Sequence, residues 1–145
     1  MFKSNGRILG LDLGTKTLGL ALSDITKTIA TTYLTLRFEN EDNDSLLPRL
    51  KEIIEKENVE LLVLGLPKNM NNTIGPRGET TLEFKEKLEK YLNMEVVMQD
   101  ERLSTVAAIN VMVEADISRK KRKEKVDSVA ANIILQTYLD RMKGR

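Results

Sequence analysis

The chain has 145 residues, of which 41% are hydrophobic and 31% charged, and its formal net charge is +1. These values are typical of one soluble globular domain, so we expect a single domain over residues 1–145. The sequence contains neither cysteine nor histidine, which excludes thiol nucleophiles, serine–histidine triads and the usual zinc sites. An enzyme of this composition must use carboxylates, lysine or hydroxyl groups, and carboxylates favour hard cations such as Mg²⁺ or Mn²⁺.

No segment approaches the roughly 18 consecutive apolar residues of a membrane span. The amino terminus, residues 1–6, is too short and polar for a signal peptide. We therefore expect a cytoplasmic protein without a membrane partner.

The first predicted element is a core strand at residues 8–13, which carries a single carboxylate, Asp12. Side chains alternate along a strand, so Asp12 shares a face with Ile8 and Gly10. A lone charge there costs on the order of several kcal/mol unless it is paired, hydrogen-bonded or bound to a cation. The next strand, residues 17–24, has only small residues on one face, so a hairpin would leave open space beside Asp12. This pattern favours a site, although an Asp before Gly also commonly bonds the amides of the following turn.

Hydrophobic periodicity and turn residues predict the remaining elements. A strand (28–38) is followed by an acidic loop (39–44), which we interpret as solvated and not as a metal cluster. A helix capped by Asp44 or Ser45 then ends near residue 57. After it come a strand (59–66), a polar loop (67–78), a helix (79–92), a strand (95–99), a helix after Ser104, a basic run (119–125) and a last helix (126–142).

Three strands in succession followed by strand–helix alternation predict an antiparallel meander continued by right-handed crossovers. The expected fold class is α/β, with a mixed five-stranded sheet and helices on both faces. The two crossover strands can lie parallel to the first strand on its free side, which leaves the first strand central.

Acidic residues stand at three structural transitions: Asp12 on the central strand, Asp100 and Glu101 at the end of a crossover strand, and Asp127 in the first turn of the last helix. Strand ends on one side of such a sheet lie together, and ligands bind there. Carboxylates gathered in this way repel one another unless a divalent ion neutralises them. Two ions about 3.5–4 Å apart can activate water and stabilise the leaving oxygen in phosphodiester cleavage.

Each acid also has a structural explanation. Only one of Asp100 and Glu101 can point towards Asp12, because successive strand residues diverge, and both could instead pair with Arg102. Asp127 suits the helix dipole and lies at the edge of the buried stripe, where it could face either the site or water. The basic run carries a formal charge of +5 over seven residues and suits either a solvated loop or contacts to phosphates.

Five motifs together make the chain resemble the YqgF (RuvX) family of RNase H-like nucleases, which is related in fold to the resolvase RuvC. They are GLDLGTKTLGLALSD (10–24), LGLP (64–67), GPRG (75–78), DERLST (100–105) and KVDSVAANIIL (125–135), and they cover nearly the whole chain in this order.

The resemblance implies an RNase H-like fold and a nuclease that matures the 5′ end of 16S ribosomal RNA with Mg²⁺ or Mn²⁺. It places the catalytic and metal-binding acids on Asp12, Asp127 and Glu101, or on Asp100 as the neighbour of Glu101. Lys16 and Arg102 match basic positions of the family that suit phosphate binding. Arg77 and Lys125, in two of the motifs, are the other expected substrate contacts. The sequence departs from the family after the first turn, where Thr17 follows Lys16 instead of an arginine, so one basic contact is missing.

Three other functions fit parts of the sequence pattern. A resolvase of branched DNA would use the same chemistry, and a non-catalytic RNA-binding factor would keep the fold. An actin-like phosphotransferase shares the Asp-x-Gly-Thr signature, but it needs a second domain for which 145 residues leave no room. The sequence does not choose between RNA and DNA, between endo- and exonuclease, or between monomer and homodimer.

Overall fold

The computed structural model describes residues 6–39, 42–67, 74–100 and 119–143, and of residues 119–127 it describes the helical backbone. The elements are β1 (Arg7–Leu13), β2 (Thr17–Ser23), β3 (Ala30–Arg37), the 3-10 helix η1 (Asn43–Ser45), α1 (Leu46–Glu57), β4 (Val59–Leu66), α2 (Pro76–Leu92), β5 (Val96–Asp100) and α4 (Arg119–Lys143).

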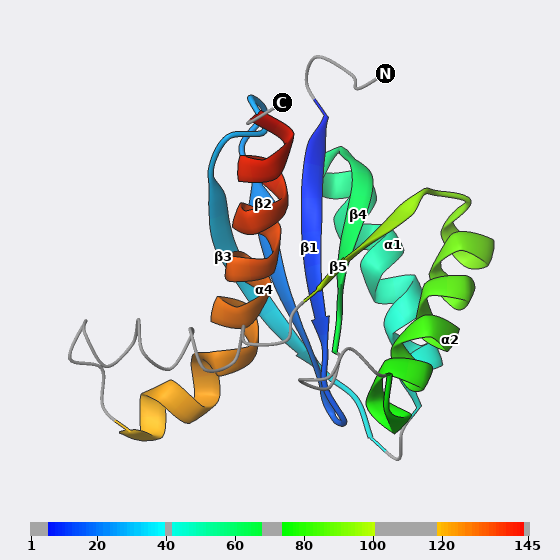
Figure 1. The fold of residues 1–145 in the computed structure, drawn as a ribbon. Helices are drawn as coiled ribbons and strands as arrows, with labels where there is room; N and C mark the ends of the chain where they lie inside the picture. The colour runs from blue at the N-terminus through cyan, green and yellow to red at the C-terminus, as the bar shows by residue number, and fades with distance from the viewer. Residues whose placement is uncertain (1–5, 40–41, 68–73, 101–118, 144–145) are drawn as a thin grey trace.

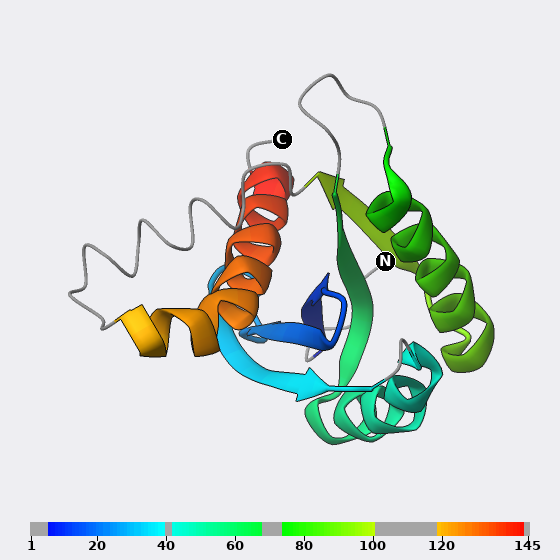
Figure 2. The same ribbon diagram turned by 90° about the horizontal axis from the view of Figure 1, so that it is seen from below.

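The five strands form one mixed sheet in the order β3-β2-β1-β4-β5 (Figure 1). β1 pairs antiparallel with β2 and parallel with β4, while β5 pairs parallel with β4. Helix α4 covers one face of the sheet, and α1 and α2 cover the other (Figure 2). The predicted meander, the two parallel crossover strands and the central position of β1 are therefore confirmed.

The two faces of the sheet have different cores. The core towards α1 and α2 is leucine-rich: Leu9 and Leu11 of the sheet and Phe84 of α2 are all fully buried. Each such side chain contributes about 1.5–3 kcal/mol to stability by burial. The face towards α4 carries smaller residues, such as Ala21, which belong to the same cluster as Ala131 of α4.

Those small residues let α4 approach the sheet closely. A Cβ atom added to Gly10 would lie 2.7 Å from the Cβ atom of Leu135 and 3.1 Å from the carbonyl oxygen of Ala131. α4 thus fills the space against the sheet at Gly10. The open space that the sequence predicts beside Asp12 stays a prediction.

Two predicted boundaries and one predicted loop were wrong. α2 begins at Pro76, inside the predicted loop, because proline suits the first helical position. α4 begins at Arg119, so the basic run is helical; lysine and arginine are good helix formers, and no glycine or proline interrupts the run. In the acidic segment, Asn43 is buried and belongs to η1 rather than to a solvated loop. The helix predicted after Ser104 lies outside the described residues.

Among the residues that the structure describes, none of the helices combines the length and the apolar character needed to cross a bilayer.

Candidate active site

Asp12 lies at the carboxyl end of the central strand and is only 5% exposed. It stands opposite Gly19 in the antiparallel ladder between β1 and β2, and glycine places no side chain beside the carboxylate. It shares its sheet face with Gly10, which α4 contacts directly. The chain therefore holds a carboxylate between the sheet and α4, where burial of a charge is costly unless polar groups or a cation compensate for it.

The turn after β1 is closed by its own backbone. The N–H of Gly14 donates to the carbonyl of Thr17 at 2.7 Å, and the N–H of Phe38 donates to the carbonyl of Lys16 at 3.0 Å. The side chains of Thr15 and Lys16 are exposed. Lys16 is thus displayed at the surface, four residues beyond Asp12, as a contact to phosphate requires.

Arg77 connects the start of α2 to the end of β1. Its Nη2 atom donates to the carbonyl oxygen of Leu13 at 3.2 Å. The first turn of α2 packs tightly on the preceding chain, because a Cβ atom on Gly78 would lie 2.4 Å from Cγ2 of Ile74 and 2.9 Å from the carbonyl oxygen of Pro67. The start of α2 is therefore held against the chain before it, and the guanidinium group of Arg77 bonds to Leu13, the residue that follows Asp12.

Asp100 ends β5 and pairs with Leu66 of β4. Gly10, Val63 and Val97 stand in one row across the parallel strands. Since faces alternate, Asp12 shares the α4 face with Gln99, and Asp100 projects to the other face. Arg141 of α4 donates to Oε1 of Gln99 at 3.2 Å, which agrees with this assignment.

Glu101 and Arg102 lie outside the described residues. Asp127 and Lys125 belong to α4, of which the structure describes only the backbone at these positions. Within the described part of the chain, no group of three acidic side chains is close enough to hold a metal ion. Asp12 is the one member of the predicted triad whose side chain is described.

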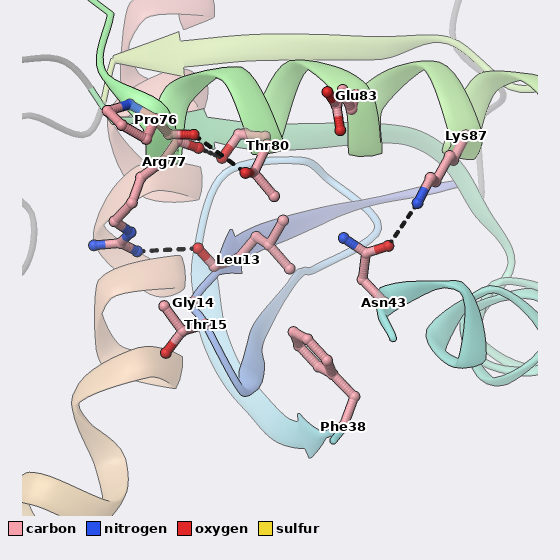
Figure 3. A pocket seen from close by; sticks show the side chains of 11 residues that line it. Leu13, Gly14, Thr15, Phe38, Asn43, Pro76, Arg77, Thr80, Glu83 and Lys87 are labelled. Atoms are coloured by element: carbon pink, nitrogen blue, oxygen red, sulfur yellow. Dashed lines mark hydrogen bonds between the residues drawn. The ribbon is translucent and has the colours of Figure 1, made fainter. Parts of the chain in front are cut away.

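A hollow of about 380 Å³ opens beside the end of β1, on the face opposite Asp12. The turn at Gly14 and Thr15, the side chains of Phe38 and Asn43, and the first turns of α2 line it (Figure 3). Of the described residues that line the hollow, Arg77 alone was predicted to belong to the site. Sequence reasoning missed Phe38 and Asn43 because they come from the end of a strand and from a segment interpreted as solvent-exposed, and neither has a motif.

The strand order and the helices on both faces are those of the RNase H-like fold of the RuvC type. RuvC of T. thermophilus, solved in complex with a Holliday junction substrate, matches with a TM-score of 0.56 and 14% identity over 94% of this chain and 96% of that one. The Holliday junction resolvase of fowlpox virus matches with a TM-score of 0.59 and 14% identity over 94% and 99% of the two chains. These similarities show the fold.

The model of the RuvX family, described as Holliday junction resolvase, matches residues 6–141. A relative from Staphylococcus aureus (strain JH9), named "Putative pre-16S rRNA nuclease", is 54% identical over 135 residues, which are 92% of this chain and 95% of the relative. The chain belongs to the RuvX family.

Proposed function

We propose that this protein is a nuclease that hydrolyses a phosphodiester bond of precursor 16S ribosomal RNA in the cytoplasm. The observation that carries the proposal is the buried carboxylate of Asp12 at the carboxyl end of the central strand, 5% exposed, in a chain of the RuvX family. The name of the 54% identical relative supports the choice of substrate.

Asp127 is the proposed second acid. The backbone of Ala131 lies against Gly10. Two residues along β1 advance about 6–7 Å and four residues along α4 advance about 6 Å. The helical backbone at Asp127 is therefore expected to come level with Asp12, one turn before Ala131.

Glu101 is the proposed third acid in preference to Asp100. Gln99 lies on the face of Asp12, and Asp100 lies on the other face. If the strand alternation continues for one residue, position 101 returns to the face of Asp12. Asp100 is kept as the alternative acid.

Carboxylates without histidine or cysteine form a donor set of hard oxygen atoms, which fits Mg²⁺ or Mn²⁺. Asp12, Glu101 and Asp127 would hold the ion, which when bound supplies an activated water and charge stabilisation at the phosphate. The proposed contacts to the substrate backbone are Lys16, which is exposed in the turn after β1, and Arg77, which bonds to the carbonyl oxygen of Leu13.

Arg102 and Lys125 are the remaining proposed substrate contacts. Lys125 belongs to the basic run at the start of α4, the stretch of highest positive charge in the sequence. Contacts of this kind position a nucleic acid without reading its sequence.

The test is Asp12→Asn, which keeps the size of the side chain and removes its charge. Cleavage of precursor 16S RNA with Mg²⁺ or Mn²⁺ should fall roughly 100-fold or more, and chelation with EDTA should abolish cleavage by the wild type. Binding of the RNA should persist. Asp42→Asn, the same change at an exposed residue, is the matched control and should cleave normally. An Asp12→Asn protein that cleaves like the wild type would exclude this site.

Resolution of four-way DNA junctions is the second candidate, favoured by the description of the family and by the two resolvases of the same fold. Both substrates, and single strands, should be offered side by side to the same preparation. Preferred cutting of the junction would replace RNA processing as the function. Binding of RNA without any cleavage by the wild type would point instead to a non-catalytic factor.

A further inference from the structure

We propose that the hollow beside the end of β1 is a base-binding pocket for one unpaired nucleotide next to the scissile phosphate. This inference deepens the proposed nuclease function and rests on it. Leu13, adjacent to Asp12 in the chain, lines the hollow, and successive strand residues project to opposite faces. A strand cleaved at Asp12 that continues over the end of β1 reaches the hollow.

The floor of the hollow is apolar. The side chains of Leu13 and Phe38 line it and are 4% and 7% exposed, so they are fixed by the leucine-rich core beneath them. Figure 3 shows both side chains directed towards the middle of the space. An apolar floor with an aromatic ring suits the flat surface of a nucleobase, which favours such contacts irrespective of sequence.

Asn43 supplies a fixed hydrogen-bond donor in the wall. The Nζ atom of Lys87 donates to Oδ1 of Asn43 at 2.9 Å. Lysine has donors only, so this contact fixes the orientation of the amide. The opposite atom, Nδ2, is directed into the hollow (Figure 3), and the residue is only 7% exposed. Nucleobases carry the carbonyl and ring-nitrogen acceptors that such a donor requires.

The charges around the hollow are balanced, which favours a base over a phosphate. Arg77 and Lys87 are positive and Glu83 is negative. Lys87 also pairs with the carboxylate of Asp44 at 3.1 Å. Arg77 stands nearest to the end of β1, where its guanidinium bonds to the carbonyl oxygen of Leu13. It is placed to hold the phosphate between the pocket and Asp12.

The size of the hollow agrees with this occupant. Its volume of about 380 Å³ is at the lower end of the range of roughly 300–1,000 Å³ for small-molecule sites. Such a space suits one base with part of its sugar. The strand must be unpaired at this position, because a base within a duplex cannot enter a hollow in the protein.

The test is Asn43→Asp in an Asp12→Asn background, which removes cleavage from the binding measurement. The carboxylate still accepts a hydrogen bond from Lys87, so the fold is kept, but the donor facing the hollow is lost. Asn93→Asp, the same change at the exposed C-cap of α2, is the matched control. Binding to short single-stranded RNAs, each with one abasic nucleotide at a different position, is measured by fluorescence anisotropy.

We expect one position at which removal of the base weakens binding roughly tenfold. Asn43→Asp should weaken binding of the intact strand by a similar factor and abolish the dependence on that position, and Asn93→Asp should do neither. The same dependence in a DNA strand would support recognition of the base rather than of the sugar.

Equal binding of all abasic strands by the parent protein, or an Asn43→Asp protein that keeps the dependence, would overturn the pocket. Neither result bears on cleavage, which is judged from Asp12→Asn alone. Phe38→Leu is the second variant: it keeps the floor apolar, removes the ring, and should weaken binding only of strands with a base at that position. Unchanged binding by Phe38→Leu would argue against a base above the ring.

Discussion

Gly10→Ala should push α4 away from β1. The new Cβ atom would lie 2.7 Å from the Cβ atom of Leu135 and 3.1 Å from the carbonyl oxygen of Ala131, whereas carbon atoms in contact are about 3.5–4.0 Å apart. The helix must therefore move by roughly 1 Å. Such overpacking costs about 1–3 kcal/mol, and the smaller backbone entropy of unfolded alanine offsets about 0.5–1 kcal/mol. The free energy of unfolding should fall by about 1–2 kcal/mol.

The same displacement should reduce cleavage more than it reduces stability. α4 carries Asp127, the proposed second acid, and a shift of about 1 Å between catalytic groups can cost roughly 100-fold in rate. We expect Gly10→Ala to cleave roughly 10–100-fold more slowly at a temperature at which it is folded. Binding of RNA should change less than cleavage, because of the proposed contacts Lys16 and Arg77 do not belong to α4, whereas Lys125 does.

Urea unfolding followed by circular dichroism measures the loss of stability, and cleavage is measured on the folded protein. Ala21→Gly is the matched control: Ala21 is buried on the same face, and its loss of a methyl group lowers stability without pushing the helix. Gly10→Ala with unchanged stability and rate would refute the close contact. Equal loss of cleavage in both variants would show that activity follows stability and not the position of α4.

Two further predictions concern the turn between β2 and β3 and its neighbourhood. The hydroxyl of Thr26 and the N–H groups of Thr28 and Ile29 donate to the carboxylate of Asp24 and lower its pKa from 3.8 to about 2. Because the pKa is lower in the folded state, the ionised carboxylate stabilises the fold at pH values above 3.8. This stabilisation is lost as the pH falls towards 2. Asp24→Asn should therefore lower the free energy of unfolding by about 1 kcal/mol at neutral pH, after discounting for solvent screening, and by nothing below about pH 2. Urea titrations at several pH values measure this difference. An equal loss at neutral and at low pH would contradict the assignment. Lys27 pairs with Glu60 at 2.9 Å between Nζ and Oε1, and its side chain is only 12% exposed. Glu60→Gln removes the negative charge of this pair and should lower the free energy of unfolding by about 2–3 kcal/mol in the same assay. A loss within error of zero would mean that solvent already screens the pair.

The sheet could be predicted from the sequence because its signals are local. β4 matches the predicted residues 59–66 because a run of eight mostly apolar residues leaves little choice of element. The hairpin of β1 and β2 follows from alternation on both sides of the turn at Gly14. The basic run was assigned wrongly because charge was given more weight than the absence of a helix breaker.

The candidate site was predictable only in part. Asp12 is conspicuous because a carboxylate interrupts an apolar strand. The side of the sheet on which Asp100 lies depends on register with Leu66, which a single strand does not encode. Asn43 owes its role to Lys87, 44 residues away, and contacts over such separations leave no periodic signal.

The bond from Arg77 to β1 ends on the carbonyl oxygen of Leu13, which every amino acid provides. A substitution at position 13 can therefore reshape the floor of the hollow while the guanidinium keeps its anchor. Substitutions at position 13 can therefore change which nucleotide is preferred, while Arg77 continues to hold the strand.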